Sequence, residues 1–169
     1  KGGSPAFSDK SDWDRPQYYR TIQTGDIDGD GADELLARSS AGMNAYKWNG
    51  MSWLSLASAT PNWGDKGGWN NARSYETIQT GDVNDDGKAE LFARTSKGID
   101  TYQWTGKTWA QLASANPELS DEHWQAAANY STIQSGDIDG DKASELVARG
   151  LYGIRTWSFD EVTANAWNR

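Results

Sequence analysis

Three acidic segments hold the residues of this chain that are best suited to chemistry. Loop one covers residues 26–34 and reads DIDGDGADE, loop two covers 82–90 and reads DVNDDGKAE, and loop three covers 137–145 and reads DIDGDKASE. Oxygen-bearing side chains at the first, third and fifth positions converge only if the backbone curls around a common centre. Gly29 and Gly31 permit this curl in loop one, because glycine adopts positive φ angles without strain.

Such a cluster of oxygens suits a hard divalent cation, and calcium takes six to eight oxygens from carboxylates, carbonyls and water. We expect each loop to offer side-chain oxygens from its first, third, fifth and ninth residues, and a main-chain carbonyl from its seventh. The predicted ligands are Asp26, Asp28, Asp30, the Ala32 carbonyl and Glu34 in loop one; Asp82, Asn84, Asp86, the Lys88 carbonyl and Glu90 in loop two; and Asp137, Asp139, Asp141, the Ala143 carbonyl and Glu145 in loop three. This pattern predicts about three Ca²⁺ ions, one for each loop.

The loops have two other interpretations. An EF-hand begins with similar spacing but needs a bidentate glutamate at its twelfth position and flanking helices. The twelfth positions here are Ala37, Ala93 and Ala148, each within a predicted strand, so the EF-hand interpretation fails. The remaining alternative is that the loops are ordinary solvated turns, since Asp and Gly are common turn residues.

The composition excludes several other kinds of function. The chain has 24 Asp and Glu against 16 Lys and Arg, and its net charge of −8 argues against nucleic-acid binding, which depends on clustered Lys and Arg. It has no cysteine and a single histidine, His123, and we find no nucleophile paired with a base. We therefore expect no catalytic activity. No apolar run approaches the length of a membrane span.

The loops belong to an internal repeat that spans the chain. The repeated segments begin at Tyr19, Tyr75 and Tyr130, which are 56 and 55 positions apart. The predicted units are residues 4–59, 60–115 and 116–169, within a single repeat domain of residues 1–169. Repetition at this length is typical of arrays built from one supersecondary unit.

Within a unit, apolar and polar residues alternate with period two, which is typical of half-buried strands. In the first unit this predicts short strands at residues 21–24, 35–38, 44–48 and 53–57, with Asn49-Gly50 as a hairpin turn, and no helices. The third unit fits the fourth strand poorly after Asp160. The predicted fold is all-β, with three four-stranded antiparallel sheets that are typical of β-propeller blades.

An acidic loop inside a hairpin, followed by an apolar strand and repeated at blade length, resembles the FG-GAP/VCBS repeats. These repeats form calcium-bearing blades in integrin α-subunit heads and in secreted fungal and bacterial lectins and enzymes. The resemblance covers nearly the whole chain and implies propeller blades with one calcium ion in the first hairpin of each. The Phe-Gly and Gly-Ala-Pro signatures that name the family are absent. Lys142 replaces the glycine at the sixth position of loop three, and we expect it to distort or weaken the third site.

Three blades do not close a ring, because propellers have roughly four to eight. One solution is a homodimer that makes a six-bladed ring, and another is that the chain is part of a longer propeller. A third is a β-trefoil, in which Tyr102-Gln103-Trp104 would be the Gln-x-Trp element of trefoil lectins. We rank the propeller first, because the loops belong to it and the unit is long for a trefoil.

Tryptophans provide the case for carbohydrate binding, because sugar rings stack on aromatic faces. Trp13, Trp69 and Trp124 recur in polar segments rich in Gly and Asn, where they either bind sugars between blades or wedge between blades as core. Arg38, Arg94 and Arg149 recur as well, and we expect them to form salt bridges to the nearby acidic loops.

The favoured function is that of a calcium-stabilised extracellular module that binds carbohydrate or glycoprotein, as a lectin does. The alternative is a non-catalytic propeller segment of a secreted enzyme or adhesin that docks a protein. The chain begins at Lys1 without Met or an apolar leader, so we expect a processed mature chain or an excised part of a longer one.

Overall fold

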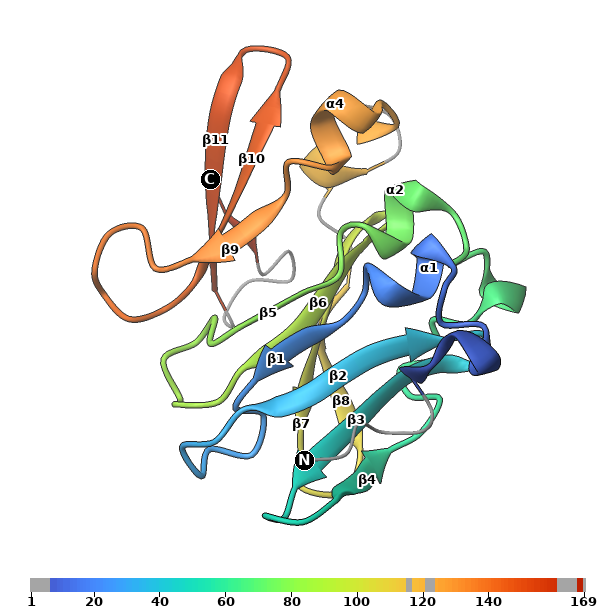
Figure 1. Cartoon of the computed structure of the whole chain (residues 1–169). Coiled ribbons are helices and arrows are strands. Elements are labelled where there is room, and N and C mark those ends of the chain that lie inside the picture. The colour runs from blue at the N-terminus through green and yellow to red at the C-terminus, as the bar shows by residue number, and fades with distance from the viewer. Residues whose placement is uncertain (1–6, 115–116, 121–123, 161–166, 169) are drawn as a thin grey trace.

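The computed structural model describes residues 7–114, 117–120, 124–160 and 167–168 (Figure 1). The first unit contains η2 (Asp9–Ser11), α1 (Pro16–Tyr19), β1 (Gln23–Gly25), β2 (Glu34–Ser39), β3 (Gly42–Trp48) and β4 (Trp53–Ala57). The second contains η3 (Asp65–Gly67), α2 (Ala72–Tyr75), β5 (Gln79–Gly81), β6 (Glu90–Thr95), β7 (Gly98–Trp104) and β8 (Trp109–Ala113). The third contains η4 (Pro117–Leu119), α4 (Ala127–Tyr130), β9 (Gln134–Gly136), β10 (Glu145–Gly150), β11 (Gly153–Phe159) and β12 (Trp167–Asn168).

The strands form three separate four-stranded antiparallel sheets, each of which lies within one repeat unit. The strand order follows the chain in every sheet: β1-β2-β3-β4, β5-β6-β7-β8 and β9-β10-β11-β12. This confirms the predicted all-β fold of three blades. The β-trefoil alternative is wrong, because each unit forms a complete sheet of its own and contributes no strands to a shared barrel.

Two details of the elements differ from the prediction. The prediction of no helices is wrong, since a single helical turn precedes each sheet. Threonine hydroxyls close these turns: Thr21 Oγ1 donates to the Tyr18 carbonyl at 2.7 Å, and Thr77 and Thr132 make the equivalent bonds. The fourth strand of the third unit does form, but only as β12, where Trp167 pairs with Phe159.

The blades are arranged with their first strands next to one another. Strand β1 contacts β5, and β5 contacts β9, while the later strands of each blade diverge outward (Figure 1). Side chains connect the inner strands directly: Thr80 Oγ1 donates to the Thr24 carbonyl at 2.8 Å, and Ser135 Oγ donates to the Thr80 carbonyl at 3.0 Å. Each blade is therefore bonded to the next by the same contact.

The apolar core lies between blades. In one cluster, Leu36 and Met43 of the first blade pack with Ile78 and Leu91 of the second unit. In the other, the second blade contributes Val83, Phe92 and Ile99, and the third unit contributes Ile133, Leu146 and Trp157. The face of one sheet is thus covered by the following unit, and a blade does not complete its own core.

Arginines at the ends of β2 and β6 connect consecutive units. Arg38 is fully buried, where its Nε donates to the Trp63 carbonyl at 2.6 Å and its Nη2 pairs with Asp65. Arg94 makes the equivalent bond to the Leu119 carbonyl at 2.9 Å. The expected salt bridge from Arg38 to its acidic loop is wrong, because Arg38 lies four residues along the strand from Glu34, about 13 Å away at the rise of an extended chain.

None of the helices in the described part of the chain has the length and hydrophobicity needed to cross a bilayer.

Candidate metal centre

Each acidic loop is the connection of the first hairpin in its blade. The ladder between β1 and β2 ends with Gly25 opposite Glu34, and the other blades end with Gly81 opposite Glu90 and Gly136 opposite Glu145. The first residue of each loop directly follows the glycine that pairs with the ninth residue. The first and ninth residues therefore lie at the same end of the hairpin. This register brings the two most distant predicted ligands of a loop close together.

The backbone of the three loops follows the same path. The fourth and sixth positions have positive φ angles in every loop: 77° and 87° at Gly29 and Gly31, 55° and 82° at Asp85 and Gly87, and 85° and 83° at Gly140 and Lys142. The expected distortion of loop three by Lys142 is not present in the backbone. Lys142 instead adopts the left-handed conformation of the glycine that it replaces, which a side chain disfavours.

The first aspartate of each loop accepts hydrogen bonds from the backbone that curls around it. Asp26 Oδ1 accepts from the N–H groups of Gly29 and Asp30 at 2.7 and 3.1 Å, and its Oδ2 accepts from that of Gly31 at 2.7 Å. Asp82 and Asp137 accept from their own loops in the same way. These bonds hold the first carboxylate at the centre of the turn.

The ninth residues, Glu34, Glu90 and Glu145, are here called the closing glutamates. All three are buried, and one oxygen of each accepts a hydrogen bond from the second residue of its loop. The distances are 3.1 Å from the Ile27 N–H, 3.0 Å from the Val83 N–H and 2.9 Å from the Ile138 N–H. The backbone thus fixes each closing glutamate through Oε2, and Oε1 takes no part in these hydrogen bonds.

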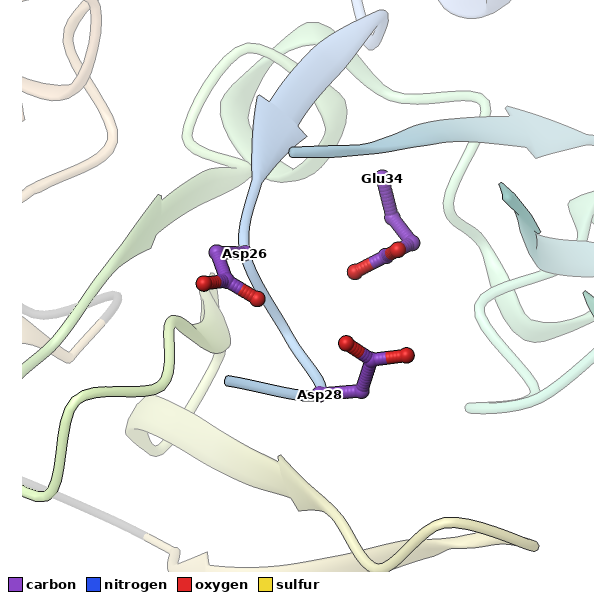
Figure 2. A group of neighbouring side chains, drawn as sticks. All are labelled: Asp26, Asp28 and Glu34. Atoms are coloured by element: carbon purple, nitrogen blue, oxygen red, sulfur yellow. The ribbon is translucent and has the colours of Figure 1, made fainter. Parts of the chain in front are cut away.

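The carboxylates of the first, third and ninth residues converge. In loop one, Asp26, Asp28 and Glu34 each bring an oxygen within 4.8 Å of the others, and Figure 2 shows the three side chains pointing toward one another. In loop three, residues Asp137, Asp139 and Glu145 form the same group. The fifth-position carboxylates Asp30 and Asp141 are outside these groups, and each accepts the N–H two residues further on, that of Ala32 or Ala143.

The oxygens of these loops fit a hard cation. Asp28 Oδ1 and Glu90 Oε1 are buried and accept no hydrogen bond of normal geometry. Buried polar atoms are costly when they are unpaired, so such oxygens indicate a missing positive partner. Burial raises the pKa of Glu90 to about 8, and the neighbouring Asp86 and Asp82 carboxylates add to this shift. Carboxylates and carbonyls in a glycine-rich turn are donors that calcium prefers, and the loop residues would hold it.

A lysine that the sequence analysis missed reaches into loop one. Lys47 Nζ lies 2.5 Å from Asp28 Oδ2, 2.7 Å from Asp30 Oδ2 and 3.4 Å from Glu34 Oε1. The pKa of Lys47 lies above its ordinary value because its ammonium donates to Asp28 and Asp30, and the same contact lowers the pKa of Asp30. Pairing between β2 and β3 could have revealed it, since Leu35 is opposite Tyr46 and the next pair places Lys47 across from Glu34.

Consecutive loops are hydrogen-bonded to each other. The N–H of Ala89 in loop two donates to the Asp26 carbonyl at 2.7 Å, and the N–H of Ser144 in loop three donates to the Asp82 carbonyl at 2.6 Å. The approach is close, because a Cβ added at Gly25 would lie 2.9 Å from the Cβ of Ala89. The conformation of one loop therefore affects the packing of the next blade.

The tryptophans predicted to bind sugars are mostly covered. Trp13, Trp69 and Trp124 expose 9%, 8% and 2% of their surface, so they do not present open ring faces. Trp69 stacks on Trp63 with ring centroids 4.4 Å apart. Trp69 and Trp124 each belong to a cluster that includes residues of the preceding unit. Trp13 packs within its own unit, against Phe7, Tyr18 and Ala37.

Trp69 nevertheless reaches the wall of a polar pocket of about 240 Å³. The pocket lies between the segment around α2 and the turn after β6. It is lined by Gly67, Gly68, Trp69, Asn71, Arg73, Ser74, Thr95 and Ser96.

His123, the one histidine of the chain, lies outside the described residues.

The solved structures that match this chain include a lectin. The structure is of an Agrocybe aegerita lectin described as recognising non-reducing terminal N-acetylglucosamine; it is 13% identical, with a TM-score of 0.44, and the alignment covers 88% of this chain and 51% of the lectin chain. This chain therefore spans about half the length of that lectin. No curated protein matches the sequence.

The sequence also matches the profile of a protein family. The family is described as FG-GAP-like repeat, and its profile matches residues 26–93 and again residues 82–148. Each match begins at the first aspartate of a loop and ends shortly after the closing glutamate of the next, so the matched unit is the one defined by the hairpin loops. The chain belongs to the FG-GAP-like repeat family.

Proposed function

We propose that this chain is a calcium-stabilised extracellular module that binds carbohydrate and has no catalytic role. The calcium assignment rests on one observation, which is that the same hairpin recurs three times. In each copy, backbone N–H groups hold the first aspartate and the closing glutamate in place. An ion bound there would compensate carboxylates that otherwise repel one another.

A bound ion would stabilise the blade and its contact with the next blade. If calcium is ten- to a hundredfold above its dissociation constant, each site contributes about 1.4–2.7 kcal/mol to the free energy of unfolding. Extracellular calcium is sufficient for sites of modest affinity, since extracellular modules commonly bind with dissociation constants of about 0.1–1 mM. The hydrogen bonds from Ala89 to Asp26 and from Ser144 to Asp82 would transmit the effect between blades.

The pocket beside Trp69 supports carbohydrate as the ligand. It combines part of an aromatic side chain with hydroxyl, amide and guanidinium groups, which together match the apolar face and the hydroxyls of a sugar. Its volume of about 240 Å³ is below the range of about 300–1,000 Å³ that is typical of drug-sized ligands. The pocket therefore suits a single sugar ring.

A glycan array probed with the full chain, with calcium or with EDTA, tests this proposal. The blocking variant is Ser96→Tyr, which fills the pocket, and the matched control is Ser40→Tyr at the equivalent position of the first blade. We expect binding to one family of terminal sugars, unchanged in Ser40→Tyr and lost in Ser96→Tyr. Binding that survives Ser96→Tyr would place the sugar elsewhere, and an array without binding would contradict the lectin function.

The two ends of the blade array favour protein docking as a second candidate. On the third blade, Ile138 and Ile154 are 61% and 71% exposed, whereas the equivalent Ile27 and Ile99 of the earlier blades are buried by the blade that follows them. On the first blade, Ile22 is 44% exposed, whereas its equivalent Ile78 is buried by the preceding blade. Each end thus exposes half of the contact that joins consecutive blades.

The polar parts of the contact are also present at both ends. Arg149 of the third blade is exposed, whereas the equivalent Arg38 is buried and donates to a carbonyl of the following unit. A Cβ added at Gly136 would meet nothing within 4 Å, whereas the equivalent Gly25 is packed against the next blade. The first blade of a second copy fits this end, because Thr24 would occupy the position of Thr80, which bonds to the preceding blade.

Two such contacts would close a six-bladed ring from two chains. Sedimentation velocity of the calcium-loaded chain tests this, and we expect a dimer that Ile154→Asp dissociates. The control is Met51→Asp, which changes an exposed residue of the first blade outside this contact. A monomer at all concentrations would exclude the homodimer. The exposed end faces would then be available to further blades or to another protein.

A further inference from the structure

The three loops differ in the residue that faces the closing glutamate from the third strand of the blade. Pairing of Leu35 with Tyr46, of Leu91 with Tyr102 and of Leu146 with Trp157 sets the same register in all blades. The next pair along places Lys47, Gln103 and Ser158 opposite the closing glutamates of loops one, two and three. The repeat thus offers a natural comparison of a cation, an amide and a hydroxyl at one position.

Lys47 brings a full positive charge to the centre of loop one. Its ammonium contacts Asp28, Asp30 and Glu34, at 2.5, 2.7 and 3.4 Å, and all three are predicted calcium ligands. Lys47 thus occupies one oxygen of each of three carboxylates that a divalent ion would use. The ammonium would oppose calcium in loop one, because two cations a few ångströms apart repel each other.

In loops two and three, no ion pair to a loop carboxylate is found among the described residues, although Lys88 and Lys142 belong to these loops. Gln103 donates its amide to Asp86 but neutralises nothing. Ser158 is exposed, and its side chain is short. Ion pairs to loop carboxylates within the described part of the chain involve only Lys47 in loop one. The carboxylates of loops two and three therefore depend on an external cation for compensation.

We propose that Lys47 is an internal cation that holds loop one closed without calcium, so that loops two and three take calcium first. This rests on the proposed function of the loops as calcium sites. It reverses the order that Lys142 suggested from the sequence, in which the third site was expected to be the weakest. Blade one then keeps its hairpin when calcium is low, and calcium controls the second and third blades.

A reciprocal exchange of the facing residues tests the proposal. Lys47→Gln gives loop one the residue of loop two, and Gln103→Lys gives loop two the residue of loop one. Lys107→Gln is the charge-matched control, since Lys107 is exposed in the turn after β7. The readout is calorimetric titration of Ca²⁺ into the full chain, after removal of bound metal with EDTA.

We expect two sites in the wild-type chain and a third at least tenfold weaker. Lys47→Gln should raise the affinity of the weak site at least tenfold, and Gln103→Lys should weaken one of the two strong sites by a similar factor. Lys107→Gln should match the wild type. Three equal wild-type sites, or a Lys47→Gln titration that matches Lys107→Gln, would overturn the proposal.

A second readout separates this proposal from the calcium assignment itself. In EDTA, Lys47→Gln should unfold at a lower temperature than Lys107→Gln, because the carboxylates of loop one lose their counter-charge. If no variant binds calcium, neither the proposed calcium function nor the proposed order in which the loops take calcium holds. The EDTA comparison would still decide whether Lys47 is the internal cation, and equal unfolding temperatures there would show that it is not.

Discussion

At the scale of single residues, buried charges decide which positions need a partner. The closing glutamates obtain one hydrogen bond each from the backbone, and Arg38 obtains carbonyls and Asp65. Asp100 on β7 is a different case, because burial raises its pKa and only Lys97 opposes the shift. The equivalent residue of the first blade is Asn44, whose Nδ2 donates to Ser39 Oγ at 3.0 Å and to the Gly42 carbonyl at 3.2 Å.

This comparison predicts that Asp100→Asn stabilises the protein at neutral pH. The folded state holds the Asp100 proton to a higher pH than the unfolded state does, so stability falls as pH rises from the ordinary carboxyl range through the raised pKa. The amide carries no charge and can donate as Asn44 does, and one such hydrogen bond contributes about 1 kcal/mol. We expect a melting temperature about 2–4 °C higher at pH 7.5.

Thermal unfolding by circular dichroism at pH 4 and pH 7.5 measures this effect. The gain should be smaller at pH 4, because burial raises the pKa of Asp100 and the folded chain holds more of its proton there than at pH 7.5. The converse variant Asn44→Asp should lose stability chiefly at pH 7.5. Equal melting temperatures of Asp100→Asn and wild type at both values would show that the charge of Asp100 has no energetic cost.

The sequence predicted those residues whose relations are local. The first, third and ninth positions of a loop lie within nine residues, and the structure brings their carboxylates together in loops one and three. Lys47 was missed because its contact depends on strand register across the next hairpin. The burial of Trp69 and Trp124 could not be decided either, because each belongs to a cluster that includes residues of the preceding unit. Trp13 is covered within its own unit, by Phe7, Tyr18 and Ala37.

At the scale of elements, the hairpin loop and the contact between blades are one structure. Loop two donates from Ala89 to loop one, and the inner strands are bonded through Thr80 and Thr24. The close approach needs glycine at the ends of β1 and β5, which are each followed by another blade. A Cβ at Gly25 would lie 2.9 Å from the Cβ of Ala89, whereas a Cβ at Gly136 would meet nothing within 4 Å.

We therefore predict different effects for the same substitution at equivalent positions. Gly25→Ala should lower the melting temperature by several degrees, because overpacking in a tight contact costs about 1–3 kcal/mol. Gly136→Ala should stay within about 0.5 kcal/mol of wild type in the monomer, as is usual for a surface change. Unfolding in calcium, at a concentration where sedimentation shows a monomer, checks both. Equal losses in the two variants would contradict the contact between loops.

The strands could be predicted from the sequence, whereas the short helices could not. Alternation of apolar and polar residues marks the positions of β2, β3 and β4 within one or two residues. The helix α1 has four residues, too few for helical periodicity to develop. Strand β12 has two residues and fits the strand pattern poorly, because pairing with Phe159, and not a pattern of its own, defines it.

At the scale of the whole molecule, the core between blades makes the stability of the array cooperative. The first and second blades share one cluster, and the second and third share another, so loss of one hairpin removes part of the core of its neighbour. The repeat predicted this architecture, because the period and the strand pattern are properties of the sequence. What covers the two end faces of the array depends on another chain or on further blades. The sequence therefore left both the homodimer and the longer propeller open.

Thermal unfolding of the full chain in millimolar calcium and in EDTA tests the central claim most directly. Two strongly bound ions at ten to a hundred times their dissociation constants would add about 3–5 kcal/mol, and we expect the melting temperature to rise by at least 5 °C in calcium. Magnesium at the same concentration should give a smaller rise, because it demands octahedral geometry and keeps its waters. The same melting temperature in calcium and in EDTA would contradict the account.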